Sequence, residues 1–388
     1  MRGASFTLVV IGGVAAAWEF PRLALSPGNV QHPFSLDDDD GDVDIVTGSQ
    51  FSGLKTFANL PYVNCFSDEE AENKKYDIAI LGAPFDTSVT ARPGARYGPT
   101  GIRTGSQRIY PDGAWSVYTG ENVLNSWATI VDCGDAPLTW LDNNVAFRQL
   151  DKPHKVISGR KASNYSVSAT PRILTLGGDH TTTLSALRST HERWDPVSVI
   201  HFDSHIDTWD PAVLGGGISD YAGVNHGTFL HIAHEEGLIR NTSIHVGIRA
   251  PLIRRKGDLR NDRRCGFDII TARDLDLLGG PGAVVSRIRD RVGSGSGHPV
   301  YISVDIDVLD PAFAPATGTA EPGGWTTREL LTVLDGLRGL PVVGADVVEV
   351  APVYDNPGEI TVLAAAEVAL SLIALMVGTP VPSGPGPE

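Results

Sequence analysis

Cysteine is scarce in this chain, and there is no excess of positive charge. The three cysteines among 388 residues, Cys65, Cys133 and Cys265, are too far apart for a zinc motif or a disulfide-rich framework. At most one bridge can form, leaving one thiol, so we do not expect the function to depend on cysteine chemistry. The formal net charge of −15 argues against nucleic acid and acidic lipid as partners. It suits a cationic substrate, although most acidic surface is simply solvating.

Long hydrophobic runs are also few, and the first one is too short to span a membrane. Residues 6–17 are apolar and follow Arg2, and Ala15 and Ala17 fit the small-residue pattern of a signal peptidase site. We therefore expect a signal peptide over residues 1–17 and a secreted protein without a membrane partner. A disordered tail or a membrane anchor is the alternative for this segment, and the cytoplasm or mitochondrion for the location.

Two sequence triplets would accept N-linked glycans on a secretory route. They are Asn164-Tyr165-Ser166 and Asn241-Thr242-Ser243, although such triplets often arise by chance. Sequence alone does not separate the two.

The rest of the chain divides into an extension, one large domain and a tail. Residues 18–66 contain Pro, Gly and an acidic run, which predicts a loose N-terminal extension. Residues 67–377 form the main domain, and residues 378–388, with four prolines and three glycines, form a disordered tail. Within the domain we expect a polar surface loop over residues 152–170 and an apolar core helix over residues 361–377.

From about Tyr76 onward, short β-branched runs alternate with helix-like segments. The expected strands are Asp77 to Leu81, Thr129 to Val131, Ile173 to Leu176, Val197 to Phe202, Ser243 to Ile248, Phe267 to Ile270, Val300 to Asp305 and Val342 to Val350. Near-continuous apolar runs suit strands buried on both faces, as in a parallel sheet. With 41% hydrophobic and 20% charged residues, we expect an α/β fold in three layers, a mostly parallel central sheet flanked by helices.

Two polar stretches stand at the ends of predicted strands. One reads His-Phe-Asp-Ser-His-Ile-Asp and the other Ser-Val-Asp-Ile-Asp, and their candidate ligands are Asp203, His205, Asp207, Asp305 and Asp307. Side chains two apart on an extended segment point to the same side, so each stretch can aim its ligands at one point. Carboxylates packed together repel one another unless cations neutralise them. Oxygen ligands with added imidazoles suit Mn²⁺ or a similar divalent ion, which predicts a two-metal hydrolytic centre.

A third stretch, Gly-Gly-Asp-His, follows the predicted strand Ile173 to Leu176 and ends at His180. The paired glycines allow a tight turn that aims His180 at the strand ends. With Gly-Gly-Asp-His, Asp-Ser-His-Ile-Asp and Ser-Val-Asp-Ile-Asp in this order, the chain resembles the ureohydrolase family of arginases and agmatinases, over residues 77–375. The resemblance implies an arginase-like fold and makes residues 67–377 the catalytic domain.

The resemblance also implies two Mn²⁺ ions in each subunit. The first ion takes His180 and Asp207, the second takes His205 and Asp307, and the bridging ligands are Asp203 and Asp305. Two dications, four carboxylates and one bridging hydroxide leave the site near −1, which suits a guanidinium. The ions would lower the pKa of the bridging water, and Asp207 would accept a hydrogen bond from the hydroxide.

Two further residues match the family pattern outside the ligand set. His226 would shuttle protons, because imidazole titrates near neutral pH; a structural hydrogen bond is the alternative. Glu349 would pair with the guanidinium as a bidentate fork. Nearby, Asp346 is interpreted as half of an internal salt bridge, and His201 as structural.

The resemblance favours agmatine as the substrate. Arginases hold the amino-acid end of arginine with an Asn and a Ser soon after Asp-x-His-x-Asp, and here Thr-Trp-Asp-Pro stands there instead. Trp209 resembles the agmatinase branch, which implies hydrolysis of agmatine to urea and putrescine. A guanidino acid such as 4-guanidinobutyrate is the alternative substrate. Loops that the family resemblance does not cover would recognise the far end of the substrate.

Two further segments resemble parts of the family, and two other classes of protein are disfavoured. Arg92 to Pro99, with Asp86 before it, resembles the substrate-side loop of agmatinases, and Thr317 to Gly324 a family turn with Ala320 in place of a usual proline. A non-catalytic secreted relative is disfavoured by the complete ligand set, and a single-zinc deacylase because one metal does not need six ligands. The family forms trimers or hexamers, which implies a homo-oligomer.

Overall fold

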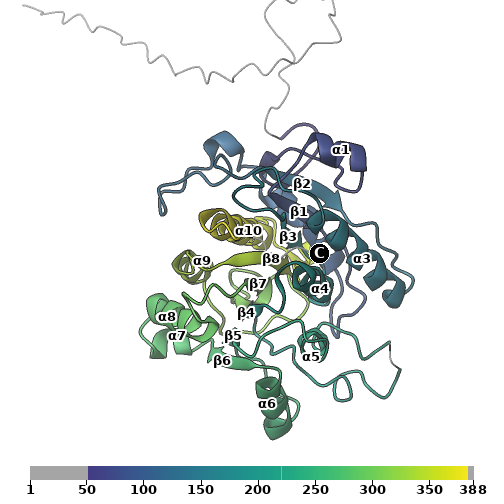
Figure 1. Cartoon of the computed structure of the whole chain (residues 1–388). Coiled ribbons are helices and arrows are strands. Elements are labelled where there is room, and N and C mark those ends of the chain that lie inside the picture. The colour runs from purple at the N-terminus through teal and green to yellow at the C-terminus, as the bar shows by residue number, and fades with distance from the viewer. Residues whose placement is uncertain (1–50, 220, 383–388) are drawn as a thin grey trace, which may run out of the picture. The chain divides into compact units, whose positions relative to one another are not determined.

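Eight strands form one sheet in which every pairing is parallel (Figure 1). In sheet order they are β2 (Ile130–Asp135), β1 (Ile78–Gly82), β3 (Arg172–Leu176), β8 (Val342–Val348), β7 (Val300–Asp305), β4 (Ser198–Phe202), β5 (Ser243–Ile248) and β6 (Phe267–Thr271). Each observed strand overlaps a predicted strand, and its ends differ from the predicted ends by a few residues at most. The predicted α/β fold with a central sheet flanked by helices is therefore confirmed.

The computed structural model describes residues 51–219 and 221–382. The expected signal peptide over residues 1–17, most of the expected extension and the last part of the expected tail lie outside the described residues. Within the described part of the tail, Val381 is buried and its carbonyl accepts a hydrogen bond from Ser168.

Helices cover both faces of the sheet (Figure 1). One face carries α2 (Gly98–Gly105), α8 (Pro281–Val292), α9 (Thr327–Gly336) and α10 (Ile360–Gly378), with the short α7 (Asp274–Leu277) beside α8. The other carries α3 (Asn143–Ser158), α4 (Thr182–Trp194) and α5 (Phe229–Glu235), with α6 (Arg255–Arg264) against the edge strand β6. Helix α1 (Asp68–Asn73) precedes β1.

The strands form because their side chains find apolar partners on both faces. In β7, Ile302 and Val304 pack into the main core under α8, α9 and α10, whereas Tyr301 packs into the second core with residues of α4 and α5. All six residues of β7 are buried. Burial on both faces explains why the runs are continuously apolar instead of alternating.

The expected core helix near the C-terminus is confirmed, and the expected polar loop is partly wrong. Helix α10 is the one described helix long and apolar enough to cross a membrane, but two thirds of that window, 67%, is buried against the sheet and its neighbours. Residues 152–158 are the last two turns of α3, with Pro153 inside the helix. The helical spacing of apolar residues is hard to recognise in this segment, because Pro153, His154 and Ser158 occupy buried positions beside Ile157.

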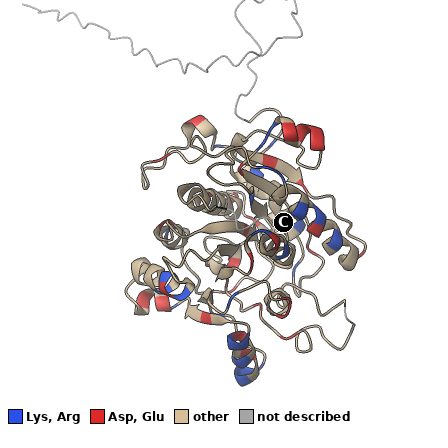
Figure 2. Cartoon of the chain, in the orientation of Figure 1, with Lys and Arg blue, Asp and Glu red and all other residues tan. Residues whose placement is uncertain are grey.

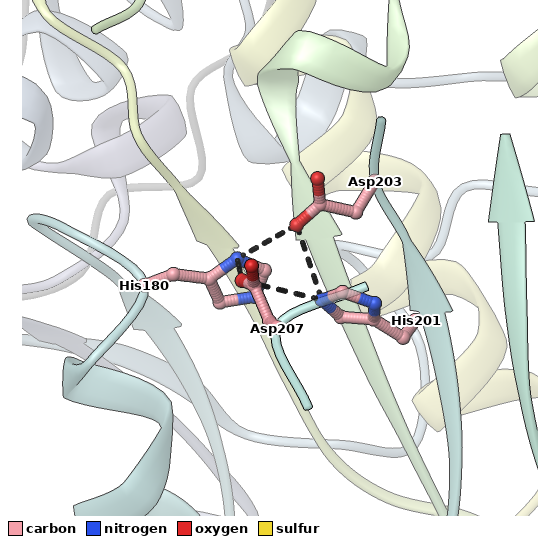
Figure 3. A group of neighbouring side chains, drawn as sticks. All are labelled: His180, His201, Asp203 and Asp207. Carbon is pink, nitrogen blue, oxygen red and sulfur yellow. Dashed lines mark ion pairs between the residues drawn. The ribbon is translucent and has the colours of Figure 1, made fainter. Parts of the chain in front are cut away.

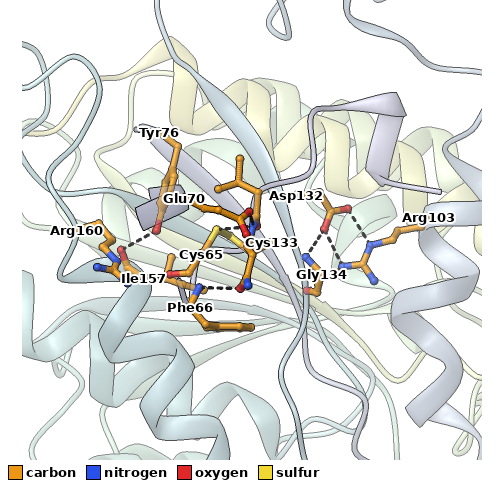
Figure 4. The surroundings of a disulfide bond; sticks show 12 residues. Cys65, Phe66, Glu70, Tyr76, Arg103, Asp132, Cys133, Gly134, Ile157 and Arg160 are labelled. Carbon is orange, nitrogen blue, oxygen red and sulfur yellow. Dashed lines mark hydrogen bonds and ion pairs between the residues drawn. A yellow bond between two sulfur atoms is a disulfide. The ribbon is translucent and has the colours of Figure 1, made fainter. Parts of the chain in front are cut away.

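The segment before α1 is tied to the sheet by a disulfide bond. Cys65 and Cys133, both buried, form the bond with their Cα atoms 5.4 Å apart, and Cys133 lies in β2 (Figure 4). Phe57 is fully buried in the main core, and Val63 lies beside the disulfide. Part of the segment assigned to the extension therefore packs onto the domain. Cys265 is the remaining thiol and is buried.

Charge is distributed unevenly over the helices. Lys and Arg gather on α6, whereas α1 carries Asp68, Glu69 and Glu70 in its first turn (Figure 2). The acidic excess of the whole chain therefore does not extend to every surface.

Candidate metal centre and active site

The predicted ligands meet at the carboxyl edge of the sheet, but turns bring them together. Strand β4 ends at Phe202, so Asp203 and Asp207 lie beyond it, and Asp207 has a positive φ of 50°. Strand β7 ends at Asp305, and Asp307 lies in a single 3-10 turn. The ligand side chains converge as predicted. They do so through these turns, and not through the alternation of side chains along a strand.

His180 points its Nδ1 atom at three carboxylates. Nδ1 lies 3.1 Å from Asp203 Oδ2, 3.2 Å from Asp207 Oδ2 and 3.3 Å from Asp305 Oδ2. Dashed lines join the carboxylates of Asp203 and Asp207 to the rings of both His180 and His201 (Figure 3). Nitrogen and oxygen donors around one point match the donor set of a hard or borderline divalent ion.

A second group forms around His205 and shares one member with the first. His205 Nδ1 lies 3.3 Å from Asp203 Oδ1 and 3.1 Å from Asp307 Oδ2. Asp203 thus directs one oxygen to each histidine, as a ligand common to two ions would. Candidate ligand atoms lie within 4.8 Å of one another in each of two groups, His180, His201, Asp203 and Asp207 in one and Asp203, His205 and Asp307 in the other.

Hydrogen bonding behind His180 leaves its Nδ1 with a lone pair. Ser303 Oγ donates to Asp346 Oδ1 at 2.6 Å and lies 2.7 Å from His180 Nε2. Because the hydroxyl has only one hydrogen, its oxygen accepts from Nε2–H, which fixes the tautomer. Asp346 also accepts from Tyr301 at 2.7 Å and Thr183 at 2.8 Å. It binds three hydroxyls, so the internal salt bridge expected for it is not formed among the described residues.

The fit to a cation follows from atoms that have no partner. His180 Nδ1 and Asp203 Oδ2 are buried and make no hydrogen bond with any described residue, although they face each other. In the neutral ring, a lone pair on Nδ1 directed at a carboxylate oxygen is repulsive, and a proton or a metal ion between the two atoms turns the contact into attraction. The residues present therefore fit a bound metal.

The electrostatics of the cluster lead to the same conclusion. Burial raises the pKa of Asp305 well above its usual value, and the nearby Asp307 and Asp203 add to the rise. Burial and Asp203 raise the pKa of Asp207 to about 6. Burial opposes a charge on His180, but Asp203 and the other carboxylates hold its pKa well above the ordinary value. Without a metal, protons would have to neutralise the cluster, and binding a metal would release them.

His201, interpreted from sequence as structural, lies in the metal cluster. Its Nε2 is 3.1 Å from Asp203 Oδ2, and its Nδ1 is 2.8 Å from Nδ1 of His245, whose Nε2 is 2.9 Å from Asp262. If His245 donates to Asp262, then His201 donates to His245 and keeps a lone pair toward Asp203. Burial lowers the pKa of His201 to about 3, which agrees with this neutral form. His201 is thus a further nitrogen that could hold a cation.

Glu349 and His226 form a buried pair beside the cluster. His226 Nδ1 lies 2.9 Å from Glu349 Oε1, and that oxygen also accepts from the His180 backbone N–H at 2.9 Å. Glu349 Oε2 is buried and has no hydrogen-bond partner in the described part of the chain. One carboxylate oxygen is therefore fully engaged and the other is free for a cationic group.

Some neighbours of His226 favour the neutral ring, and others favour the charged ring. The Thr90 backbone N–H lies 3.1 Å from Nε2 and can donate to a lone pair of the neutral ring, whereas the Thr90 hydroxyl, 2.8 Å from Nε2, can accept from Nε2–H of the charged ring. Burial also opposes charge, but Glu349 raises the pKa of His226 to about 9. Opposed demands of this kind suit a group that must both give and take a proton.

The backbone around the site is unusual at the functional residues. Asp207 and Glu349 adopt positive φ values of 50° and 59°, which cost non-glycine residues energy and occur mostly at functional sites. At Gly178 an added Cβ would lie 1.8 Å from the Phe85 carbonyl oxygen. The glycine is needed there because two chain segments approach closely, and not for the tight turn that we expected from the sequence.

Residues of opposite charge border the site. Glu321 Oε1 lies 3.8 Å from His205 Nε2, and its side chain is half-buried. Arg92 donates from Nε to the carbonyl of Gly318 at 3.2 Å and stacks on Tyr354. A Cβ on Gly318 would lie 3.7 Å from Glu349 Oε2 and 2.7 Å from the Arg92 carbonyl, so the backbone of Arg92 lies near the Glu349 carboxylate.

The side chains of the two residues directly after Asp207 form hydrogen bonds with α6. Thr208 donates from Oγ1 to Asp262 at 2.6 Å, and Trp209 donates from Nε1 to Asp258 at 3.2 Å. Both side chains are buried. Neither is free to bind the amino-acid end of arginine.

Comparison with known proteins identifies the family. The model of the arginase family matches residues 76–375. Putative agmatinase 1 of Schizosaccharomyces pombe is 49% identical over 386 residues, covering 97% of this chain and 95% of that protein. The structure of proclavaminate amidino hydrolase from Streptomyces clavuligerus superposes with a TM-score of 0.71 at 34% identity, covering 84% of this chain and 98% of that chain. A hypothetical agmatinase from Burkholderia thailandensis gives a TM-score of 0.70 at 33% identity, covering 84% and 91%. The chain therefore belongs to the arginase family of ureohydrolases, in its agmatinase-like branch, and is a hydrolase acting on guanidino C–N bonds.

Proposed function

We propose that the protein hydrolyses agmatine to urea and putrescine with two Mn²⁺ ions bound at the cluster. The observation that carries the proposal is the free, buried oxygen Oε2 of Glu349 next to a cluster of metal ligands. A buried carboxylate oxygen without a donor is stabilised by a cationic N–H group. A guanidinium supplies such groups and holds the carbon to be attacked.

The proposed ligands keep the roles implied by the family resemblance. His180 and Asp207 would hold one ion, His205 and Asp307 the other, and both ions would share Asp203 and Asp305. When bound, the two ions supply Lewis acidity that lets a water between them ionise near neutral pH. Mn²⁺ is proposed because the donors are carboxylate oxygens and imidazole nitrogens without thiolate.

Glu349 and His226 carry out the steps that depend on the chain itself. Glu349 would orient the guanidinium through Oε2; the expected bidentate pair also requires Oε1, which His226 and the His180 N–H now occupy. His226 would give its proton to the leaving amine nitrogen as the C–N bond breaks. Asp207, whose pKa is raised to about 6, would accept a hydrogen bond from the nucleophile.

The charge at the border supports agmatine over arginine. Thr208 and Trp209 are committed to α6, so the usual region for binding the amino-acid end is closed. Glu321 has no cationic side chain within salt-bridge distance other than His205 among the described residues, and its carboxylate can meet the distal ammonium of agmatine.

A second candidate substrate is a guanidino acid such as 4-guanidinobutyrate. Arg92 donates to the carbonyl of Gly318, which lies next to Glu349, and it has no carboxylate partner among the described residues. A substrate carboxylate would pair with this guanidinium. We place agmatine first because Glu321 is closer to the ligand cluster, through His205.

The test is urea release from agmatine, arginine, 4-guanidinobutyrate and 3-guanidinopropionate, with added Mn²⁺ and with a chelator. Turnover of agmatine that requires the metal supports the proposal. Urea from the guanidino acids but not from agmatine would overturn the choice of substrate. No urea from any of the four, with the metal bound, would favour the non-catalytic relative.

Two matched variants separate the substrates by charge. If agmatine is the substrate, Glu321→Gln should raise its KM about fivefold, since one half-exposed pair contributes roughly 1 kcal/mol, and Arg92→Gln should change it little. If a guanidino acid is the substrate, the order is reversed.

Assembly and location also stay proposals. A homo-oligomer, a trimer or hexamer, is expected from the family resemblance, and light scattering of the purified chain tests it. The proposed location is the secretory pathway.

A further inference from the structure

We propose that Asn241 carries an N-linked glycan, and that Asn164, the other sequon asparagine in the described chain, does not. The proposal is independent of the hydrolase chemistry. It rests on the different surroundings of the two side-chain amides and on the state of the cysteines.

Asn164 is built into the fold through its amide. Its Nδ2 donates to Asp77 Oδ2 at 3.1 Å and to the carbonyl of Trp127, and its backbone N–H donates to Asp77 Oδ1 at 2.7 Å. Asp77 is fully buried, and no cationic side chain pairs with it among the described residues. A sugar on Nδ2 would replace one hydrogen and fill the space of a buried partner. A chain glycosylated there could not make these contacts.

Asn241 has the opposite surroundings. It is exposed in the turn between α5 and β5, and its side-chain amide makes no hydrogen bond to any described residue. Its Oδ1 side lies against the backbone of Gly266, where an added Cβ would be 2.9 Å from Oδ1. Its backbone carbonyl accepts from Arg291 at 2.6 Å, which fixes the turn without using the amide. A glycan on Nδ2 would therefore extend into solvent.

The cysteines indicate that the chain folds where glycans are added. Cys65 and Cys133 form a buried disulfide (Figure 4), and disulfides form and persist mainly in oxidising compartments. The third cysteine, Cys265, is buried, and burial raises the pKa of its thiol to about 12, so it does not react readily. No free thiol is exposed to mispair in such a compartment.

The modification is a transfer of a preassembled oligosaccharide from a lipid diphosphate donor. The bond between the first sugar carbon and the donor phosphate breaks, and a bond from that carbon to Asn241 Nδ2 forms. The amide proton passes to a base, and the lipid diphosphate leaves. Ser243, the third residue of the sequon, is buried in the folded chain, so transfer precedes folding of this turn. A chain modified at Asn164 is then excluded at the folding step, because it cannot form the contacts of Asn164 Nδ2 with Asp77 and Trp127.

The glycan would lie far from the metal cluster along the sheet. Asn241 precedes the start of β5, whereas the ligands follow the carboxyl ends of β4 and β7. Removing the glycan should therefore leave the KM and kcat for the guanidino substrate unchanged. Failure of this proposal would say nothing about the hydrolase, and failure of the hydrolase would say nothing about the glycan.

The experiment uses the full chain with its own N-terminus, expressed in a yeast that secretes proteins. Protein from the medium is treated with an N-glycosidase in heavy-oxygen water and digested, and the peptides are analysed by mass spectrometry. We expect the heavy-oxygen aspartate at position 241 and unmodified asparagine at position 164. Asn241→Gln should abolish the change in gel mobility on deglycosylation.

The matched variant Asn164→Gln separates the two roles. It should keep the glycan and lower the unfolding midpoint, because Asp77 loses partners, whereas Asn241→Gln made without a glycan should unfold like the parent. A glycan at position 164, secreted protein without a glycan at 241, or full-length chain found only unmodified inside the cell would each overturn the proposal.

Discussion

The two edges of the sheet treat polar groups in opposite ways. At the carboxyl edge, β4 and β7 lead into buried carboxylates that crowd His180 at 3.1 to 3.3 Å. At the amino edge, β4 begins at Ser198, whose hydroxyl pairs with that of Thr242 at 2.6 Å. Neutral hydroxyls satisfy each other within the chain, whereas buried like charges need a cation from outside.

The largest expected effect comes from removing a shared carboxylate at the carboxyl edge. Asp305→Asn takes away one negative charge that both ions would share, and we expect loss of metal and about a thousandfold lower turnover, equivalent to ~4 kcal/mol. Metal per chain by mass spectrometry and urea release measure the two effects. Ser198→Ala, at the amino edge, should retain both. Full metal content in Asp305→Asn would refute the assignment.

A smaller loss should follow when the substrate partner is changed and the ligands are kept. Glu349→Gln removes the buried negative charge proposed to face the guanidinium, and we expect about a hundredfold lower kcat/KM, since a charge-assisted bond contributes ~2–3 kcal/mol. Metal content, measured on the same sample, should stay at the parental value. If kcat/KM hardly changes, Glu349 does not bind the substrate.

The next prediction concerns the hydroxyl behind His180. Ser303→Ala removes the acceptor that fixes the ring of His180, and metal affinity should fall by roughly 10- to 100-fold. Titration against a competing chelator measures this affinity. Ser198→Ala on the neighbouring strand also loses one hydroxyl pair, yet it should bind metal like the parent. Equal effects of the two variants would mean that the edges do not differ.

The smallest effect is one of stability, at the amino side of the sheet. His154 is buried and lines a small cavity with Ile173 and Val343, near the starts of β3 and β8, and burial lowers its pKa to about 4. An unfolded histidine titrates near 6.5, so the neutral ring contributes stability that is lost as the pH falls from about 6.5 to 4. Between about pH 7 and pH 5 this amounts to ~2 kcal/mol.

His154→Gln does not titrate and isolates this contribution. The unfolding free energy of the variant should fall ~2 kcal/mol less than that of the parent between the same two pH values, as measured by urea denaturation. Parallel losses in parent and variant would show that His154 is not buried in its neutral form.

The sheet could be predicted because its signal is local. The six inner strands are buried along their whole length, and burial on both faces requires a largely apolar run wherever such a strand lies. The ligand cluster was also accessible, because Asp203, His205 and Asp207 lie close in sequence and open α/β sheets bind ligands at their carboxyl ends. Their convergence depends on the turn after Phe202 and the positive φ of Asp207, which no residue pattern indicates.

What could not be predicted depends on contacts between distant segments. The chain His201–His245–Asp262 crosses from β4 to β5 and α6, and only the paired register of the strands brings these residues together. The three hydroxyls on Asp346 likewise come from α4 and β7. Three cysteines allow three pairings, and sequence spacing does not choose among them.

The bond between Cys65 and Cys133 has a practical consequence for handling the protein. The loop that it closes contains an exposed segment around Tyr118, a residue that is 88% exposed and offers a protease an easy point of cleavage. A chain cut there would still migrate as one species on a non-reducing gel, and would separate into two fragments only after treatment with a reductant. Intact mass under both conditions is therefore the sensible first check on any purified sample.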